Sequence, residues 1–305
     1  MADFQGIIVI HKEKGFTSHD VVAKMRGILR QKKIGHTGTL DPDATGVLPV
    51  CLGSATKLCD MLTDRDKEYE AVMQLGISTD TQDLSGEVLK ECPVTVTEEE
   101  ARNAILSFIG DYDQIPPMYS ALNVNGKKLY ELARAGKEVE RQPRAVTIYD
   151  ITILDMKLPD VTFRVSCSKG TYIRTLCYDI GVKCGCLAAM KSLKRIKAGV
   201  FREESAITLA ELEKLRDEER VGEVVVPVDH FFEELAPVHI PDEFIKYIKN
   251  GNSFYPQQIK ERIGFGDGED VRVYDEAGRF YGVYTMKRQE GRFVPKKMFL
   301  ENDLK

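Results

Sequence analysis

Residues 33–50 read Lys-Ile-Gly-His-Thr-Gly-Thr-Leu-Asp-Pro-Asp-Ala-Thr-Gly-Val-Leu-Pro-Val and follow no regular helical or strand pattern. This stretch sets the carboxylate of Asp41 among glycines, threonines and prolines. Glycine allows a ligand to approach the backbone where a Cβ would block it, and Pro42 fixes the chain directly after the acid. The stretch therefore predicts a loop that presents Asp41 to a ligand. A plain surface loop with an Asx-type turn at Asp41 uses the same residue types and stays open on this basis.

The composition is that of a folded protein with a substantial core. A length of 305 residues allows one large domain or two, and 43% hydrophobic residues are enough for a buried interior. The N-terminus lacks a basic region followed by a long apolar run, and no stretch reaches the roughly 18 apolar residues of a membrane span. We expect a cytoplasmic protein.

The seven cysteines are odd in number and scattered, which argues against a disulfide framework. Cys184 and Cys186 are the only close pair, and the next histidine downstream is His230. A zinc site would need a second pair or histidines at ligand spacing. We therefore predict free thiols and no metal site.

Charge is distributed unevenly along the chain. A net charge of −5 argues against nucleic-acid binding. Binding depends on the local field, however, and basic residues gather in three stretches. These are Lys24, Arg26, Arg30, Lys32 and Lys33; Lys127, Lys128, Arg134, Lys137, Arg141 and Arg144; and Lys191, Lys194, Arg195 and Lys197. We predict a basic face that the net charge underestimates.

Residue patterns predict an α+β fold. Apolar residues at helical spacing predict a helix that begins at Thr17 or Ser18 and reaches Leu29. Capping boxes predict two more helices, one over 97–109 and one beginning at Thr208. Strands are predicted at 6–10, 69–75, 146–151 and 161–166 by β-branched or alternating runs. These strands indicate a central antiparallel or mixed sheet flanked by helices.

The last part of the chain changes character. From about residue 238 the pattern becomes short strands with tight turns, as in 271–280 and 282–285. We predict two domains, residues 1–236 and 237–305, the second small and β-rich.

Several ordered motifs carry a resemblance to one family. Gly38-Thr39-Leu40-Asp41 resembles the core motif of pseudouridine synthases, and the longer run through Val50 is similar to the TruB type, the tRNA pseudouridine(55) synthases. Three further blocks fit this type in order: 67–83, which begins Lys67-Glu68-Tyr69; 116–136, which begins Pro116-Pro117; and 167–176, which contains Arg174. The resemblance covers nearly the whole chain. It implies a pseudouridine synthase fold with a C-terminal PUA-like RNA-binding domain.

The implied reaction isomerises uridine 55 in the tRNA T-loop to pseudouridine. An N-glycosidic bond breaks and re-forms through C5 of the flipped base, so no cofactor is needed. The resemblance implies that Asp41 is the catalytic carboxylate, that Arg174 lowers its pKa, and that Tyr69 stacks on the uracil and assists proton transfer. A core tyrosine and a structural ion pair are the alternatives for Tyr69 and Arg174.

The resemblance also implies residues that bind the substrate. His36 would fill the gap that flipped bases leave in the T-loop, and Tyr172 and Leu193 would wall the pocket. An insertion around 110–145 would form a mobile RNA clamp through Lys127, Lys128 and Arg134, although a solvated basic face is the alternative. Lys12 belongs to the family's first motif and is also expected to contact substrate.

Two positions depart from the family pattern. The first motif, usually Asp-Lys-Pro-x-Gly, here reads His11-Lys12-Glu13-Lys14-Gly15, which removes the rigid proline. The usual Gly-Cys-Gly-Ala-His appears as Gly185-Cys186-Leu187-Ala188-Ala189, so any RNA contact made by that histidine is missing. Neither departure touches Asp41, Tyr69 or Arg174.

Three other functions fit parts of the sequence. Residues 41–45 match the Asp-x-Asp-x-Thr pattern of aspartyl-phosphate phosphatases, but the preceding residues cannot form the hydrophobic parallel strand which that motif requires. A non-catalytic tRNA-folding module would not need the intact Asp41, Tyr69 and Arg174 set. A guide-RNA-dependent synthase would lack the basic insertion. We therefore expect a monomeric tRNA-modifying enzyme that needs no protein partner and binds no membrane.

Overall fold

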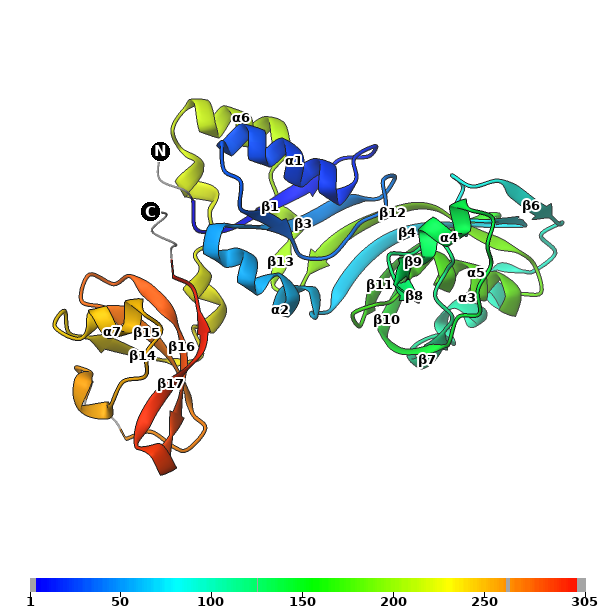
Figure 1. The fold of residues 1–305 in the computed structure, drawn as a ribbon. Helices are drawn as coiled ribbons and strands as arrows, with labels where there is room; N and C mark the ends of the chain where they lie inside the picture. The colour runs from blue at the N-terminus through cyan, green and yellow to red at the C-terminus, as the bar shows by residue number, and fades with distance from the viewer. Residues whose placement is uncertain (1–3, 125, 262–263, 301–305) are drawn as a thin grey trace.

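The computed structural model describes residues 4–124, 126–261 and 264–300, which form two bodies set at an angle (Figure 1). The larger body is built on a nine-stranded mixed sheet in the order β1-β3-β12-β4-β11-β10-β7, with β2 beside β3 and β13 beside β12. Its strands are β1 (Gly6–Lys12), β2 (Ile34–His36), β3 (Thr45–Leu52), β4 (Lys67–Leu75), β7 (Gly110–Gln114), β10 (Arg144–Lys157), β11 (Asp160–Cys167), β12 (Ala188–Ala198) and β13 (Phe201–Arg202). All neighbours pair antiparallel except β12 and β3.

Helices cover this sheet in two groups. Near β1 and β3, α1 (Ser18–Leu29) and α6 (Leu209–Asp217) pack over one face, whereas η1 (Gly53–Leu58) and α2 (Cys59–Thr63) lie below it (Figure 1). At the other end, α3 (Glu98–Leu106) and α5 (Ile173–Lys183) cover β4, β10 and β12. The predicted capping boxes at Thr97 and Thr208 are present, and Thr17 forms a third with Asp20. The α+β prediction is confirmed.

Helix α3 ends three residues earlier than the 97–109 pattern predicted. The amide groups of Phe108 and Ile109 bond to carbonyls three residues back, which makes a tightened final turn. Gly110 then has φ +114°, a conformation that turns the chain directly into β7. The apolar pattern continued because Phe108 still packs against the core, whereas Ile109 is exposed.

Two short hairpins project from the larger body. One pairs β5 (Ile77–Thr79) with β6 (Val88–Glu91), and the other pairs β8 (Asn123–Val124) with β9 (Lys127–Lys128). The second hairpin leads into α4 (Leu129–Arg134), so the predicted clamp contains regular structure. We use "clamp segment" for residues 119–144 from here on.

The smaller body is a four-stranded sheet in the order β14 (Ala236–Ile240), β15 (Asp270–Asp275), β16 (Phe280–Lys287) and β17 (Arg292–Met298), with α7 (Ile245–Lys249) beside it. Only β14 and β15 are parallel. Its own apolar core includes Val238, Phe254, Tyr284 and Phe293. The remaining short helices are η2 (Glu203–Ser205), η3 (Val221–Val224), η4 (Val228–Phe232), η5 (Pro256–Gln258) and η6 (Arg288–Glu290).

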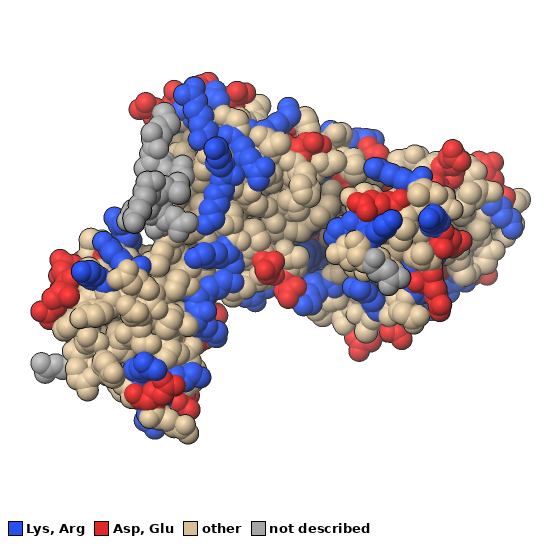
Figure 2. Space-filling view, viewed as in Figure 1, with Lys and Arg blue, Asp and Glu red and all other residues tan. Residues whose placement is uncertain are grey.

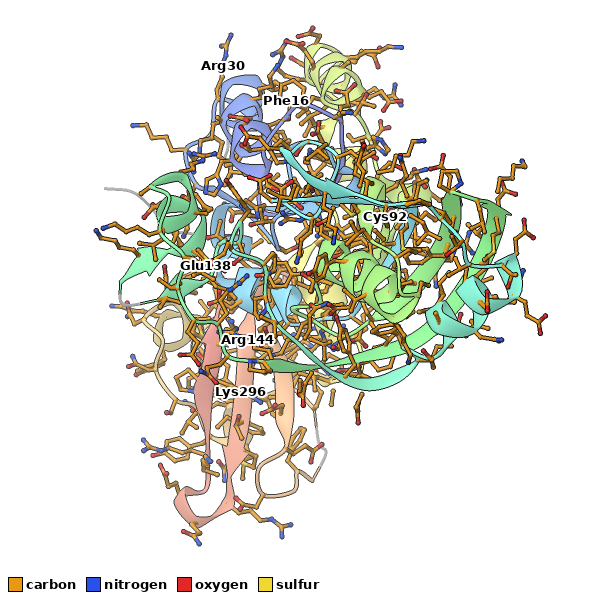
Figure 3. The ribbon with its side chains drawn as sticks, turned by 90° about the vertical axis from the view of Figure 1, so that its right-hand side faces the viewer. Phe16, Arg30, Cys92, Glu138, Arg144 and Lys296 are labelled. Atoms are coloured by element: carbon orange, nitrogen blue, oxygen red, sulfur yellow. The ribbon has the colours of Figure 1, made fainter. Side chains whose placement is uncertain are left out.

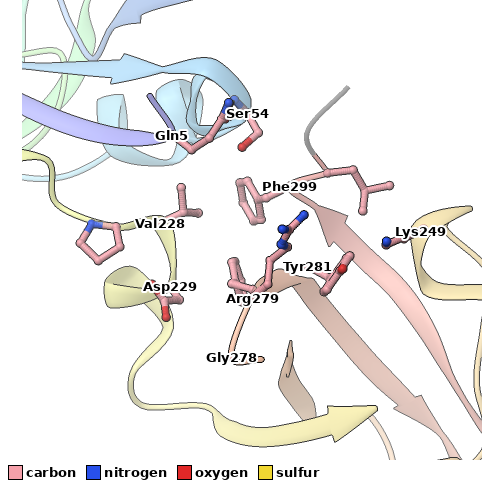
Figure 4. Close-up of a pocket in the computed structure, with 12 residues that line it drawn as sticks. Gln5, Ser54, Val228, Asp229, Lys249, Gly278, Arg279, Tyr281 and Phe299 are labelled. Atoms are coloured by element: carbon pink, nitrogen blue, oxygen red, sulfur yellow. Dashed lines mark hydrogen bonds between the residues drawn. The ribbon is translucent and has the colours of Figure 1, made fainter. Parts of the chain in front are cut away.

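An apolar seam joins the two bodies. Phe232 of η4 lies 5.8 Å from Phe299 and 5.9 Å from Phe280, measured between ring centroids. The same buried cluster continues into β1 and β3 through Val9 and Val47. Beside the seam lies a cavity of about 390 Å³, with Gln5 and Ser54 on one side and Asp229, Lys249, Tyr281 and Phe299 around it (Figure 4). This cavity shares no lining residue with the pocket at Asp41.

All seven cysteines are free thiols, as predicted. Across the described ranges, no helix is both long and apolar enough to cross a bilayer.

Candidate active site

Asp41 lies on the loop between β2 and β3, and that loop is fixed from several sides. Thr37 donates through its amide and its hydroxyl to the Pro49 carbonyl, at 3.1 and 3.3 Å. The amide of Leu40 donates to Ser18 Oγ at 2.9 Å. Where the loop enters β3, a Cβ on Gly46 would lie 2.2 Å from the Arg195 carbonyl oxygen. Only glycine fits there, so the sequence pattern reflects close packing as well as ligand access.

Lys12 holds the Asp41 loop through hydrogen bonds to backbone carbonyls. Its side chain is fully buried, and its ammonium group donates to the carbonyls of Glu13, Phe16 and Pro42 at 3.1, 2.5 and 3.0 Å. Burial lowers the pKa of Lys12 to about 8, against the opposing effect of Asp41. These contacts occupy the ammonium group, so we now propose that Lys12 positions the Asp41 loop instead of contacting substrate.

Arg174, the second residue of α5, holds the Asp41 carboxylate at two points. Its Nε lies 3.0 Å from Oδ2, and its Nη2 donates to Oδ1 at 3.3 Å. The rest of the guanidinium donates to the carbonyls of Tyr119 and Thr81 at 3.0 and 3.2 Å. Arg174 is 7% exposed, whereas Asp41 is 37% exposed. The arginine is therefore a buried support behind a carboxylate that still faces outward.

Asp83 joins this group, a role that the sequence did not reveal. Its Oδ2 lies 3.7 Å from Arg174 Nη1, and its Oδ1 accepts hydrogen bonds from Thr81 and Ser85. Burial raises the pKa of Asp41, and Asp83 acts in the same direction. Arg174 lowers the Asp41 pKa as predicted, but the combined effect of burial and Asp83 outweighs it. The carboxylate is therefore more basic than a solvated aspartate.

Tyr69 of β4 stands opposite Arg195 of β12 in the sheet. The two side chains are hydrogen-bonded, and Tyr69 is 8% exposed. Arg195 is 1% exposed, and its Nε donates to the Val47 carbonyl at 2.7 Å. Burial raises the pKa of Tyr69 to about 12, so its hydroxyl keeps its proton at neutral pH. Arg195 thus fixes the tyrosine from the interior of the sheet.

A pocket of about 290 Å³ opens beside Asp41. It is lined by Lys14, Asp41, Asp43, Ala44, Thr45, Asp83, Leu84, Ser85, Met190, Lys191, Ser192, Leu193 and Lys194. This lining includes the carboxylates of Asp41, Asp43 and Asp83 and two apolar side chains of β12, Met190 and Leu193. Leu193, which the resemblance assigned to the pocket together with Tyr172, is among the lining residues.

Comparisons with known proteins match nearly the whole chain. Residues 26–173 match the model of the TruB family pseudouridylate synthase N-terminal domain. Residues 174–233 and 236–299 match the tRNA pseudouridylate synthase B C-terminal domain and the pseudouridine synthase II TruB C-terminal model. The chain belongs to the TruB family of pseudouridine synthases.

Named relatives agree with this assignment. The tRNA pseudouridine synthase B of Lachnoclostridium phytofermentans is 50% identical, with 97% of this chain and 99% of that protein covered. The tRNA pseudouridine synthase B of Alkaliphilus oremlandii is 48% identical, with 93% of this chain and 94% of that protein covered. Among solved structures, a Cbf5-Nop10-Gar1 complex contains a chain that is 30% identical, with a TM-score of 0.69, 98% of this chain and 86% of that one covered. The predicted TruB fold is confirmed.

The TruB resemblance also singled out Tyr172 and His36, neither of which lines this pocket. Tyr172 is half-buried at the N-cap of α5, two residues before Arg174. His36 ends β2, with its ring edge-to-face on His19 at 5.2 Å between centroids. Burial, then the charges of His19 and Arg195, lower the pKa of His36 to about 4, so its ring is neutral at pH 7. Its Nδ1 has no hydrogen-bond partner within the described residues.

The clamp segment presents its cations in different ways. Lys127 is exposed, whereas Lys128 Nζ donates to the Ala121 carbonyl at 2.9 Å. Arg134 lies over the Tyr130 ring at 5.5 Å. The segment ends at Arg144, where β10 begins, and Glu138 lies shortly before it (Figure 3).

The third predicted basic stretch is not a free RNA-binding face. Arg195 is buried, and the other three cations are paired: Lys191 with Asp160, Lys194 with Glu203 and Lys197 with Glu68, at 2.6 to 2.8 Å. The prediction of a basic face is therefore corrected for this stretch. A cluster of basic residues in the sequence does not reveal which side chains the folded sheet buries or pairs with carboxylates. The phosphatase alternative also lacks its parallel strand, since β2 runs antiparallel to β3.

Proposed function

We propose that this protein isomerises uridine 55 in the T-loop of tRNA to pseudouridine. The observation that carries the proposal is the two-point pair of Arg174 with Asp41, whose side chain lines the 290 Å³ pocket. The pocket has the size and the apolar wall for a flipped pyrimidine, and the carboxylate faces into it. The names of the relatives indicate tRNA as the substrate, and the TruB resemblance indicates position 55.

The chemistry requires three groups at this place. Asp41, ionised, acts on the uridine while the bond from N1 to C1′ breaks, and the detached uracil turns so that C5 bonds to C1′. The C5 proton is then lost and N1 gains one, so the atoms balance without a co-reactant. Tyr69 keeps its hydroxyl proton at neutral pH and can relay this transfer. Arg174 favours the ionised form of Asp41, in opposition to burial and Asp83.

A band of unpaired cations supports the RNA partner. Lysine and arginine side chains gather from the α1 region toward the smaller body (Figure 2). At the junction, Lys57 Nζ donates to the Met298 carbonyl at 2.8 Å. Burial, and then the charges of Lys33 and Lys297, lower the pKa of Lys57. Lys33, Lys57 and Lys297 form no ion pair in the part of the chain that the structure describes. We call these three residues the junction lysines. Like charges without counter-charges suit a polyanion.

We further propose a monomer that works in the cytoplasm without a guide RNA, a cofactor or a protein partner. The named relatives match along almost their full length, and the chain carries its own clamp segment. That segment contacts the active site directly, because the Tyr119 carbonyl accepts from Arg174.

An unmodified tRNA transcript tests the proposal. The purified protein should convert uridine 55 to pseudouridine, mapped by chemical adduct formation and primer extension. Asp41→Asn keeps the side-chain size but removes the charge, so it should abolish conversion while leaving tRNA affinity within about threefold. Asp155→Asn, at an exposed position of β10 that does not line the pocket, is the matched control. Conversion by Asp41→Asn at the wild-type rate would exclude Asp41 as the catalytic group.

A further inference from the structure

Gln114, the last residue of β7, is buried away from the pocket and yet bonds to a residue of the site. Its side chain is 1% exposed. Oε1 accepts from the Tyr172 amide at 2.7 Å, and Nε2 donates to the Tyr172 carbonyl at 3.0 Å. One carboxamide thus binds both backbone polar groups of Tyr172. Such a paired contact fixes position and orientation together.

The carboxamide has only one suitable orientation. Tyr112 donates its hydroxyl proton to Asp179 Oδ2 at 2.7 Å, which leaves its oxygen to accept from Gln114 Nε2 at 2.8 Å. The amino group must therefore face Tyr112 and the Tyr172 carbonyl, and Oε1 must face the Tyr172 amide. Asp179 lies on α5. The network consequently begins and ends on the helix that carries Arg174.

The start of α5 has no other cap. Tyr172 is its N-cap residue, but the tyrosine side chain makes no capping hydrogen bond. The first turn is instead attached to β7 through Gln114, and Arg174 stands in that turn. Five residues after Gln114, the Tyr119 carbonyl accepts from Arg174 Nη2. Residues 114–119, which include two prolines, therefore touch the first turn of α5 at both of their ends.

We propose that Gln114 is a positioning residue for the isomerisation: it sets Tyr172 and the first turn of α5 so that Arg174 meets Asp41. Through residues 114–119 it also ties the clamp segment to the catalytic arginine. This inference rests on the proposed function. Gln114 is not a catalytic residue, because it does not line the pocket and because the residue that binds the Asp41 carboxylate is Arg174.

Two substitutions separate positioning from general support of the fold. Gln114→Leu keeps most of the volume but removes every hydrogen bond. When ionised, the carboxylate of the Gln114→Glu variant has two acceptors and no donor, so it repels the Tyr172 carbonyl oxygen. When protonated, the same carboxyl offers one donor and one acceptor and so matches the amide of glutamine. The groups that face position 114 are Tyr112 with Asp179 behind it, Tyr172, and Arg144 across the β7–β10 pair.

The rate of pseudouridine formation should be measured in single turnover at saturating tRNA from pH 5.5 to 8. Gln114→Leu should be slower by about tenfold or more with tRNA affinity within about threefold, since small misplacement of a catalytic group costs rate more than binding. The rate of Gln114→Glu relative to wild type should rise as pH falls. Tyr112→Phe, which keeps the bonds from Gln114 to Tyr172, should lose much less.

Thermal unfolding and tRNA affinity would confirm that each variant is folded. A folded Gln114→Leu enzyme with the wild-type rate would overturn the proposal. A ratio of the Gln114→Glu rate to the wild-type rate that does not change with pH would also overturn it. The loss of rate would then not depend on whether the side chain at position 114 offers both a donor and an acceptor. Failure of the wild-type protein to form pseudouridine would instead refute the proposed function, which keeps the two failures distinct.

Discussion

Arg174 is the residue on which most of the candidate site depends. It binds the Asp41 carboxylate at two points and also bonds to Thr81, near Asp83, and to Tyr119 in the clamp segment. A planar guanidinium can hold all these partners at once, whereas an ammonium group cannot. Burial is the main cause that raises the pKa of Asp41, and Arg174 is the main cation that opposes it.

Arg174→Lys should move the pH dependence of the reaction. The substitution keeps one charge but loses the two-point pairing, so less attraction opposes the burial that raises the Asp41 pKa. The acidic limb of the rate profile should shift to higher pH, and the plateau rate should fall by about tenfold or more. Single-turnover rates between pH 5 and 8 check this. Arg216→Lys, on an exposed ion pair of α6, is the control, and an unchanged acidic limb would contradict the role of Arg174.

Tyr69→Phe tests whether the hydroxyl group participates. The ring remains available for stacking, so tRNA affinity should stay within about threefold, while turnover should fall by about tenfold or more if the proton is relayed. Single-turnover rates and filter binding give the two quantities. The exposed Tyr149→Phe serves as the control. Full activity of Tyr69→Phe would reduce the residue to a stacking surface.

At the scale of helices, sequence predicted the starts of α1, α3 and α6 correctly and the end of α3 wrongly. Side-chain caps at Thr17, Thr97 and Thr208 are local and were readable, whereas the end of α3 depends on a tightened turn before Gly110. The resemblance supplied Asp41, Tyr69 and Arg174. It gave no role to Arg195, Asp83 or Gln114, because their importance lies in partners that are distant in sequence.

The clamp segment yields a prediction about salt. Replacing Lys127, Lys128 and Arg134 with alanine should weaken tRNA binding and flatten its salt dependence, since each duplex phosphate contact contributes about 0.9 to the slope of log K against log salt, and each single-strand contact about 0.7. Binding titrations at several salt concentrations measure this slope. A triple alanine variant at Lys157, Lys214 and Arg216 is the matched control. Identical slopes in both variants would leave the clamp segment a solvated surface.

At the scale of the whole molecule, the junction lysines place positive charge on both bodies at once. An RNA that reaches from the pocket to the smaller body would contact both. Lys33→Ala combined with Lys297→Ala should therefore weaken binding of full-length tRNA more than binding of an isolated T-arm stem-loop. Competition binding with both RNAs tests this. Equal effects on the two RNAs would place the contact inside the stem-loop itself.

The apolar seam between the two bodies sets a limit on their independence. Phe232 and Val47 of the larger body share one buried cluster with Val283 and Phe299 of the smaller one. Cutting the chain at residue 236 would expose an apolar patch on each fragment to solvent. Such patches promote self-association of the fragments. Each body has its own sheet, but each also covers apolar surface of the other. A shortened protein would therefore need polar substitutions at this surface to stay monomeric.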